Sequence, residues 1–157
     1  MARKYFLFLA ALLLAANACS LNKGSIKLEA QVDYKMGGPQ PVAQTKFHLF
    51  NSELTAVAKG EREKGDSGNK EALESLSDLI MLQFEMPSIR SASTVDYDIQ
   101  KAMPLLQPYL VQTQETDFKG IATFSNLKPG DYTLLGVTET RGGYAFWMYK
   151  TTVKSGD

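Results

Sequence analysis

Polar and apolar residues alternate along several parts of the chain, which is the pattern of strands with one buried face. Residues 26–35 show it most regularly, and residues 43–49 repeat it after a turn at 37–41. The positions that we expect to face inward are Ile26, Leu28, Ala30, Val32, Tyr34, Ala43, Thr45, Phe47 and Leu49. A weaker alternation over residues 54–58 predicts a short third strand.

The pattern changes at Lys59. Residues 60–68 are charged, rich in glycine and without an apolar anchor, which predicts a solvated loop. Asn69 then stands where a helix N-cap is expected. The apolar spacing after it predicts a helix with one buried stripe, ended at Met86–Pro87; the stripe consists of Leu73, Leu76, Ile80 and Phe84.

A second, shorter helical pattern follows. It begins with Thr94 as a cap and ends at Met103, after which Pro104 and Pro108 are expected to return the chain to extended structure. The sequence therefore predicts a helical insertion over about residues 60–108.

Strand patterns return in the last third of the chain, at residues 109–116, 121–125, 131–140 and 144–153. Residues 132–137 and 144–149 are apolar on both alternating faces, so these two strands need cover on both sides. An opposing sheet would supply one cover and the inserted helices the other. Residues 155–157 look like a turn with nothing after it, and we therefore expect the sequence to stop before a final strand.

The N-terminus has the pattern of an export signal. Arg3 and Lys4 precede an uncharged run over residues 5–16 that would reach only ~18 Å as a helix, short of the ~30 Å of a bilayer core. Residues 1–18 are therefore predicted to be a signal peptide. Ala16-Asn17-Ala18 suits the ordinary signal peptidase, and the same residues with Cys19 resemble a bacterial lipobox, although Ala16 replaces the usual Leu.

Cys19 is the single cysteine of the chain. An exported protein has little use for a lone thiol, whereas a thioether to diacylglycerol removes it. We expect Cys19 to be the lipidated first residue of the mature chain, residues 19–24 to be a tether, and the acyl chains to hold the protein on a membrane. Ser20 follows, not Asp. By resemblance to enterobacterial lipoproteins this favours the outer membrane, at its periplasmic face or at the cell surface.

The motif with the most information covers residues 116–134, Thr-Asp-Phe-Lys-Gly-Ile-Ala-Thr-Phe-Ser-Asn-Leu-Lys-Pro-Gly-Asp-Tyr-Thr-Leu. Asp117 can accept a backbone N–H in its turn, and Gly120 permits a positive φ. Pro129 and Gly130 provide a second tight turn. The side chains expected to point inward are Ala122, Phe124, Leu127, Tyr132 and Leu134.

This motif resembles the pattern T-D-x-x-G-x-a-x-F-x-x-L-x-P-G-x-Y of the prealbumin-like sandwiches, which include the carboxypeptidase regulatory-like domain, transthyretin-like proteins and collagen-adhesin B-type repeats. The resemblance covers about residues 25–58 and 109–157, with Pro41-Val42-Ala43 at the start of the second strand. It implies a mainly β, antiparallel, prealbumin-like (Ig-like) β-sandwich over residues 25–157, with the helices inserted. It implies little about function.

Some family properties are not expected here. Adhesin repeats that form a Lys–Asn isopeptide bond need a Glu-x-x-x-P segment, where this chain has Val137 and Arg141. Lys27 is therefore expected to face solvent. A carboxypeptidase zinc site would need two histidines, and the chain contains one, His48.

Composition excludes several function classes. The 17 basic and 17 acidic residues balance, so no basic excess points to nucleic acid. One cysteine and one histidine exclude disulfide frameworks and zinc fingers, and no phosphate-binding loop or other cofactor motif occurs. His48 lies on a polar strand face and is expected to be exposed. We predict no catalytic residues, no metal and no enzyme activity.

The sequence thus predicts a non-catalytic cell-envelope lipoprotein, a structural or protein-interaction module with an envelope protein as its partner. A ligand-binding alternative stays open. The aromatic side chains of the last strand, Tyr144, Phe146, Trp147 and Tyr149, could form a platform for a carbohydrate or a peptide. The competing interpretation is that these rings pack in the core.

Overall fold

Four of the strands form one antiparallel sheet in the order β5-β4-β7-β8, hereafter the central sheet. The computed structural model describes residues 23–34, 37–65, 67–84, 91–141 and 143–154. The predicted signal peptide, the lipidation of Cys19 and the turn at 155–157 lie outside the described residues. The strands of the central sheet are β4 (Lys46–Phe50), β5 (Leu110–Glu115), β7 (Gly130–Thr140) and β8 (Gly143–Val153).

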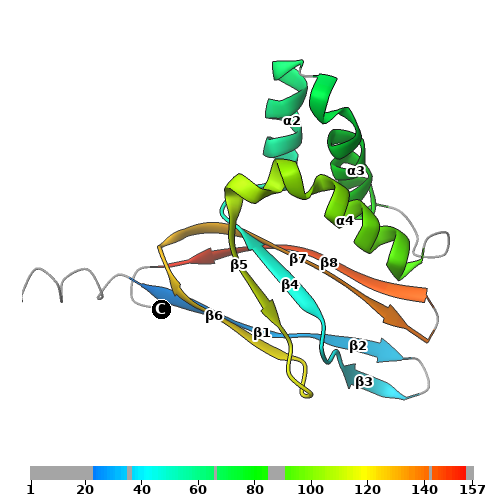
Figure 1. Cartoon of the computed structure of the whole chain (residues 1–157). Coiled ribbons are helices and arrows are strands. Elements are labelled where there is room, and N and C mark those ends of the chain that lie inside the picture. The colour runs from blue at the N-terminus through cyan, green and yellow to red at the C-terminus, as the bar shows by residue number, and fades with distance from the viewer. Residues whose placement is uncertain (1–22, 35–36, 66, 85–90, 142, 155–157) are drawn as a thin grey trace, which may run out of the picture.

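A second layer lies against one face of the central sheet (Figure 1). It consists of two antiparallel pairs, β1 with β6 and β2 with β3. Its strands are β1 (Gly24–Glu29), β2 (Gln31–Tyr34), β3 (Gly38–Pro41) and β6 (Ile121–Leu127). The two layers together form the β-sandwich that the sequence predicts.

The single strand predicted over residues 26–35 is divided at Ala30. The Ala30 N–H donates to the carbonyl of Gly120 at 2.8 Å, and the Ala30 carbonyl accepts from the N–H of Val42 at 2.9 Å. Ala30 thus bonds to two neighbouring segments at once, and the strand changes its partner from β6 to β3 on either side of it. Alternation alone gives no sign of this change.

The first hydrophobic core fills the space between the two layers. Phe47 of β4 packs there against Trp147 of β8, with ring centroids 5.4 Å apart. All five side chains that the motif places inward are buried, which confirms that part of the prediction. The buried members are Ala30, Val42, Phe47, Leu49, Phe124, Leu127, Tyr132, Leu134 and Val153, and Ala122 is buried beside them.

The turns of the motif also form as predicted. The carboxylate of Asp117 accepts the N–H groups of Lys119 at 2.8 Å and Ile121 at 2.9 Å, and Gly120 has a φ of 77°. The Tyr132 hydroxyl donates to the carbonyl of Lys128 at 2.7 Å, across the second turn. These bonds fix where β6 and β7 begin.

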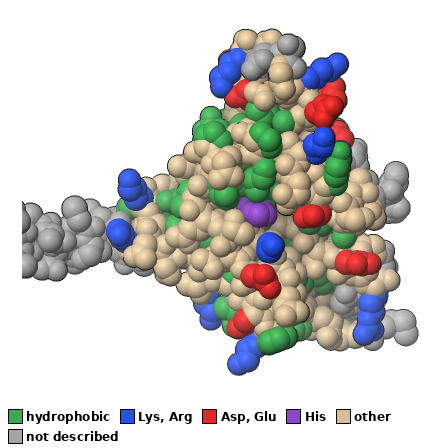
Figure 2. Space-filling model, in the orientation of Figure 1, with side chains coloured by type: hydrophobic (Ala, Val, Ile, Leu, Met, Phe, Trp, Pro, Cys, Tyr) green, Lys and Arg blue, Asp and Glu red, His purple; other side chains and the backbone are tan. Residues whose placement is uncertain are grey.

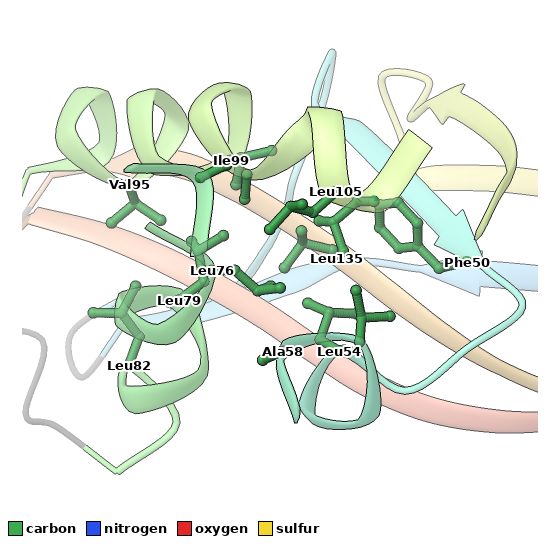
Figure 3. Close-up of a cluster of buried hydrophobic side chains, with 14 residues drawn as sticks. Phe50, Leu54, Ala58, Leu76, Leu79, Leu82, Val95, Ile99, Leu105 and Leu135 are labelled. Carbon is green, nitrogen blue, oxygen red and sulfur yellow. The ribbon is translucent and has the colours of Figure 1, made fainter. Parts of the chain in front are cut away.

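Helices cover the other face of the central sheet (Figure 1), so both of its faces are covered as the sequence predicts. The helices are α2 (Leu54–Lys64), α3 (Lys70–Met81) and α4 (Ala92–Leu106), with short 3₁₀ turns at Ser67–Asn69 and Gln107–Tyr109. Figure 3 shows their buried side chains meeting Phe50 and Leu135 of the sheet. No described helix is long and apolar enough to cross a bilayer.

Two predictions about the insertion are wrong. Residues 54–64 are helix α2, not a strand followed by a loop, because Leu54, Val57 and Ala58 form a buried face at helical spacing. Helix α4 is capped by Ser91, whose hydroxyl accepts the N–H of Thr94 at 3.2 Å.

The predicted helix ends are also inexact. Helix α3 ends at Met81, before the predicted stop at Met86–Pro87, which lies outside the described residues. Helix α4 continues through Pro104 to Leu106, although Pro104 was expected to end it. Pro104 cannot donate to the carbonyl of Gln100, and the helix continues past it because Leu105 and Leu106 are buried in the helical core. Phe84, predicted on the buried stripe of α3, lies beyond the helix and is 78% exposed.

Candidate functional site

An open cleft of about 630 Å³ lies along the outer edge of β8. Five consecutive residues of that strand, 144–148, line it. One wall comes from β2 and the other from the turn that follows α3. The remaining lining residues are Gln31 and Val32 on the β2 side and Leu82 and Gln83 on the α3 side. We call this hollow the edge cleft.

The structure brings three of the four predicted aromatic residues to the edge cleft. Tyr144 and Phe146 point toward the helices and are partly buried against the helical core. Trp147 points the other way, toward the core between the layers, and is also partly buried. Tyr149 is 66% exposed and does not line the cleft. Since neighbours in a strand alternate in direction, the rings do not form one flat platform.

The walls of the cleft could not be found from the sequence. Gln31 and Val32 lie in the first strand pattern, and Leu82 and Gln83 lie at a helix end, far from β8 in sequence. No motif links these positions, because only the packing of the second layer and of α3 on the central sheet brings them together. None of the nine lining residues carries a charge.

His48 lies at a second hollow of about 440 Å³, between β4 and the N-terminal half of α4. It was predicted to be exposed but is half-buried, because its strand face is covered by the helices (Figure 2, purple). Its Nδ1 lies 2.9 Å from the hydroxyl oxygen of Thr113. Burial lowers the pKa of His48, the nearby Asp96 acts to raise it, and Lys46 lowers it further.

The other groups with shifted pKa values belong to exposed pairs and turns. Hydrogen bonds, first from the backbone of Ile121, lower the pKa of Asp117. The ammonium of Lys150, 2.8 Å from a carboxylate oxygen of Glu53, lowers the pKa of that acid. The carboxylate of Glu71, 3.0 Å away, raises the pKa of Lys101. These groups stabilise turns and element contacts, and none of them lines the edge cleft.

In the part of the chain that the structure describes, no three His, Cys, Asp or Glu side chains are grouped so that they could hold a metal ion. The hollow beside His48 is lined by carboxylate and hydroxyl groups of Asp96, Glu139, Thr45, Ser93 and Thr138. The described hydrogen bond of the His48 ring is made to Thr113, which does not line this hollow.

Comparison with known proteins gives little beyond the fold. No protein-family model matches the chain, and no curated protein matches it in sequence. A solved structure of a candidate carbohydrate-binding protein from Pseudomonas aeruginosa is 14% identical, with a TM-score of 0.45, and the match covers 87% of this chain and 84% of that one.

Two structures of the pilus backbone protein RrgB from Streptococcus pneumoniae are each 15% identical, with TM-scores of 0.38 and 0.37. Each match covers 85% of this chain, which spans only 26% and 34% of the two pilin chains. At these identities and scores, the three similarities say nothing about what this chain binds.

Proposed function

We propose that the protein is a lipid-anchored, non-catalytic β-sandwich module of the bacterial cell envelope that acts through contact with another envelope protein. The observation that supports this role is the uncharged edge cleft, lined by part-buried apolar and aromatic side chains. Such a surface suits the burial of a partner's side chains, whereas catalysis uses groups that gain, lose or stabilise charge. The described groups with shifted pKa values, His48, Glu53, Lys101 and Asp117, do not line the edge cleft.

The proposal also covers the fold family of the chain and its place in the cell envelope. The motif at residues 116–134 and its two turns support membership of the carboxypeptidase regulatory-like group of prealbumin-like sandwiches. The lipobox-like segment before Cys19 supports export and anchoring, with the outer membrane as the expected site.

Intact mass spectrometry of the protein purified from bacterial envelopes tests the anchor. We expect a chain that begins at Cys19 and carries a diacylglycerol thioether and an acylated amine, and that leaves the membrane only with detergent. A Cys19→Ala variant is the matched control and should be released without lipid. A mature chain with an unmodified Cys19 would contradict the anchor.

Pull-down from intact envelopes tests the interaction role. The wild-type chain should co-purify with a defined envelope protein. The Cys19→Ala form should not co-purify with it, because without the anchor the chain is not held at the membrane. Turnover of any substrate by the purified protein would contradict the non-catalytic role.

A second candidate function is binding of a carbohydrate or a peptide, favoured by the position of Tyr144, Phe146 and Trp147 in the edge cleft. The lining offers few polar side-chain groups, namely those of Gln31, Gln83 and Tyr144 and the indole N–H of Trp147. A sugar ring would bury many hydroxyls with few partners, so a peptide fits this lining better. Trp147 is the only tryptophan. A change in its emission with oligosaccharides would favour the carbohydrate.

A further inference from the structure

We propose that the edge cleft accepts one extended, uncharged segment of another protein, which adds to the central sheet as a strand beside β8. This inference deepens the interaction role proposed above and rests on it, but it is independent of the lipid anchor. The argument uses the free edge of β8, the walls on either side of it and the chemistry of the lining.

The free edge of β8 can form backbone hydrogen bonds. Among the described strands β8 pairs only with β7, from Gly143 opposite Thr140 to Val153 opposite Gly130, without a register shift. In an antiparallel sheet, alternate residues of an edge strand point both N–H and C=O away from the sheet. A regular row of donors and acceptors therefore faces the cleft.

Within the described residues, this edge lacks the usual protection against strand pairing. Natural edge strands carry charges, prolines or bulges, or are covered by another element. Residues 144–149 contain no charge and no proline, and no bulge interrupts their pairing with β7. The opposite edge of the sheet differs. There a register shift interrupts the pairing of β4 with β5, and Gln112 of β5 donates to the carbonyl of Ser125 in β6 at 2.7 Å.

The walls favour one strand over a second copy of the whole sheet. The side chains of Gln31 and Val32 lie on one side of the edge, and those of Leu82 and Gln83 on the other. The cleft follows five residues of β8, a run of about 17 Å. A single extended segment fits between the two walls. If β8 of a second copy lay there, the β2 and α3 walls of that copy would contact the β2 and α3 walls of the first.

The lining defines the chemistry of the segment. Phe146 and Met148 are part-buried on the helical side, and Val32 and Trp147 on the side of the second layer. A strand added beside β8 points alternate side chains toward these two sides. Its side chains should therefore be uncharged over residues 144–148 and should bring apolar groups to both sides, as valine does and as threonine does through its methyl group.

The test uses the purified full chain in detergent and, as the probe, a capped synthetic peptide of alternating threonine and valine. Trp147 fluorescence reports binding, because it is the only tryptophan and lies in the cleft. Amide hydrogen exchange locates the peptide. We expect a saturable blue shift and slower exchange at residues 144–148. The control peptide has the same side chains but N-methylated amides, and it should not bind.

Matched variants test the location. Ala145→Lys places a charge on the free edge and should weaken binding at least tenfold. Val111→Lys places the same charge on β5, the opposite edge strand, where Val111 is exposed, and should leave binding unchanged. Both variants should give the wild-type circular dichroism spectrum. These results do not depend on Cys19, so failure here is separable from failure of the proposed anchor.

Three outcomes would overturn the proposal. Equal binding of the N-methylated peptide would show that no strand is added. Protection of residues 144–148 without peptide would show that another occupant already fills the cleft, a second copy if the protection rises with protein concentration and the chain itself if it does not. Absence of any protection at residues 144–148 would show that the cleft accepts no strand.

Discussion

Gly120 is the residue at which three segments of the second layer meet. Its φ is 77°, its carbonyl accepts the N–H of Ala30, and an added methyl group would overlap the Ala30 carbonyl oxygen and approach the Val42 nitrogen to 3.1 Å. Both the backbone conformation and the space require glycine. The turn and the strand division at Ala30 therefore depend on one another.

We predict that Gly120→Ala lowers the free energy of unfolding by at least about 2 kcal/mol, the combined cost of a left-handed alanine and an overpacked contact. Urea denaturation followed by Trp147 fluorescence measures it. A loss below about 0.5 kcal/mol would mean that Ala30 and Gly120 are not tightly joined in solution.

His48 predicts a pH dependence of stability. Burial lowers its pKa in the folded state below the ordinary 6.5, so the unfolded chain binds the proton more readily. The contribution of His48 to the free energy of unfolding is therefore complete above about pH 6.5. It is lost as the pH falls through the lowered pKa of the folded state. Urea midpoints measured across this range should fall on acidification.

The control for this prediction is His48→Gln, which removes the titration and keeps a polar side chain. Its urea midpoint should vary less between pH 6.5 and the onset of carboxylate protonation. Asp117 titrates separately, because its lowered pKa lies below the ordinary 3.8 and its contribution is lost only in stronger acid. An unchanged slope in the variant would show that His48 is not desolvated.

At the scale of elements, α2 shows why sequence reasoning failed where it did. Leu54, Ala56 and Ala58 alternate as in a strand, yet Leu54 and Ala58 also belong with Val57 to one helical face. The charged residues after them looked like a loop but form the solvated side of the helix, with Lys59 and Glu63 one turn apart at 3.9 Å. Over so short a run, the two periodicities cannot be separated.

Gly60 gives a prediction for this helix. It lies inside α2 with nothing within 4 Å of an added methyl group. Gly60→Ala should raise the free energy of unfolding by about 0.5–1 kcal/mol, because alanine loses less backbone entropy in a helix. Thermal melts followed by circular dichroism measure it. A destabilised variant would indicate that residue 60 is not helical, and the contrast with Gly120→Ala controls for the substitution itself.

The β elements were predicted more fully than the helices. Strands β6, β7 and β8 begin and end within two residues of their predicted limits, because turn residues in the sequence separate one strand from the next. The division at Ala30 was missed, since it depends on the carbonyl of Gly120, which is distant in sequence. Strand β3 (Gly38–Pro41) was also missed, because its glycine and prolines predicted a turn. The sequence pointed to Tyr144, Phe146 and Trp147 of β8 but predicted a platform, and it gave no sign of the walls that make the edge cleft.

At the scale of the whole molecule, the central sheet belongs to two hydrophobic cores. Leu134 and Leu135 are neighbours in β7, yet Leu134 is buried between the layers and Leu135 under the helices. If the central sheet unfolds, the side chains of both cores become exposed to water. The sandwich and the helices should therefore unfold together.

We predict that Leu134→Ala and Leu135→Ala each cost about 2–5 kcal/mol. In both variants, helical circular dichroism and Trp147 fluorescence should give the same urea midpoint. A helical signal lost at lower urea than the fluorescence in Leu135→Ala would show that the helical layer is a separate folding unit.

The two ends of the helical excursion meet at one point of the sheet. The N–H of Asn51 donates to the carbonyl of Tyr109 at 3.0 Å, and Phe50 lies opposite Leu110 in the pairing of β4 with β5. A pulling force on the ends of the described chain acts first on β1 and β8. The helices bear no tension until β4 separates from β5. Pulling would thus remove β8 from the central sheet, and open both hydrophobic cores, before the helices come under tension.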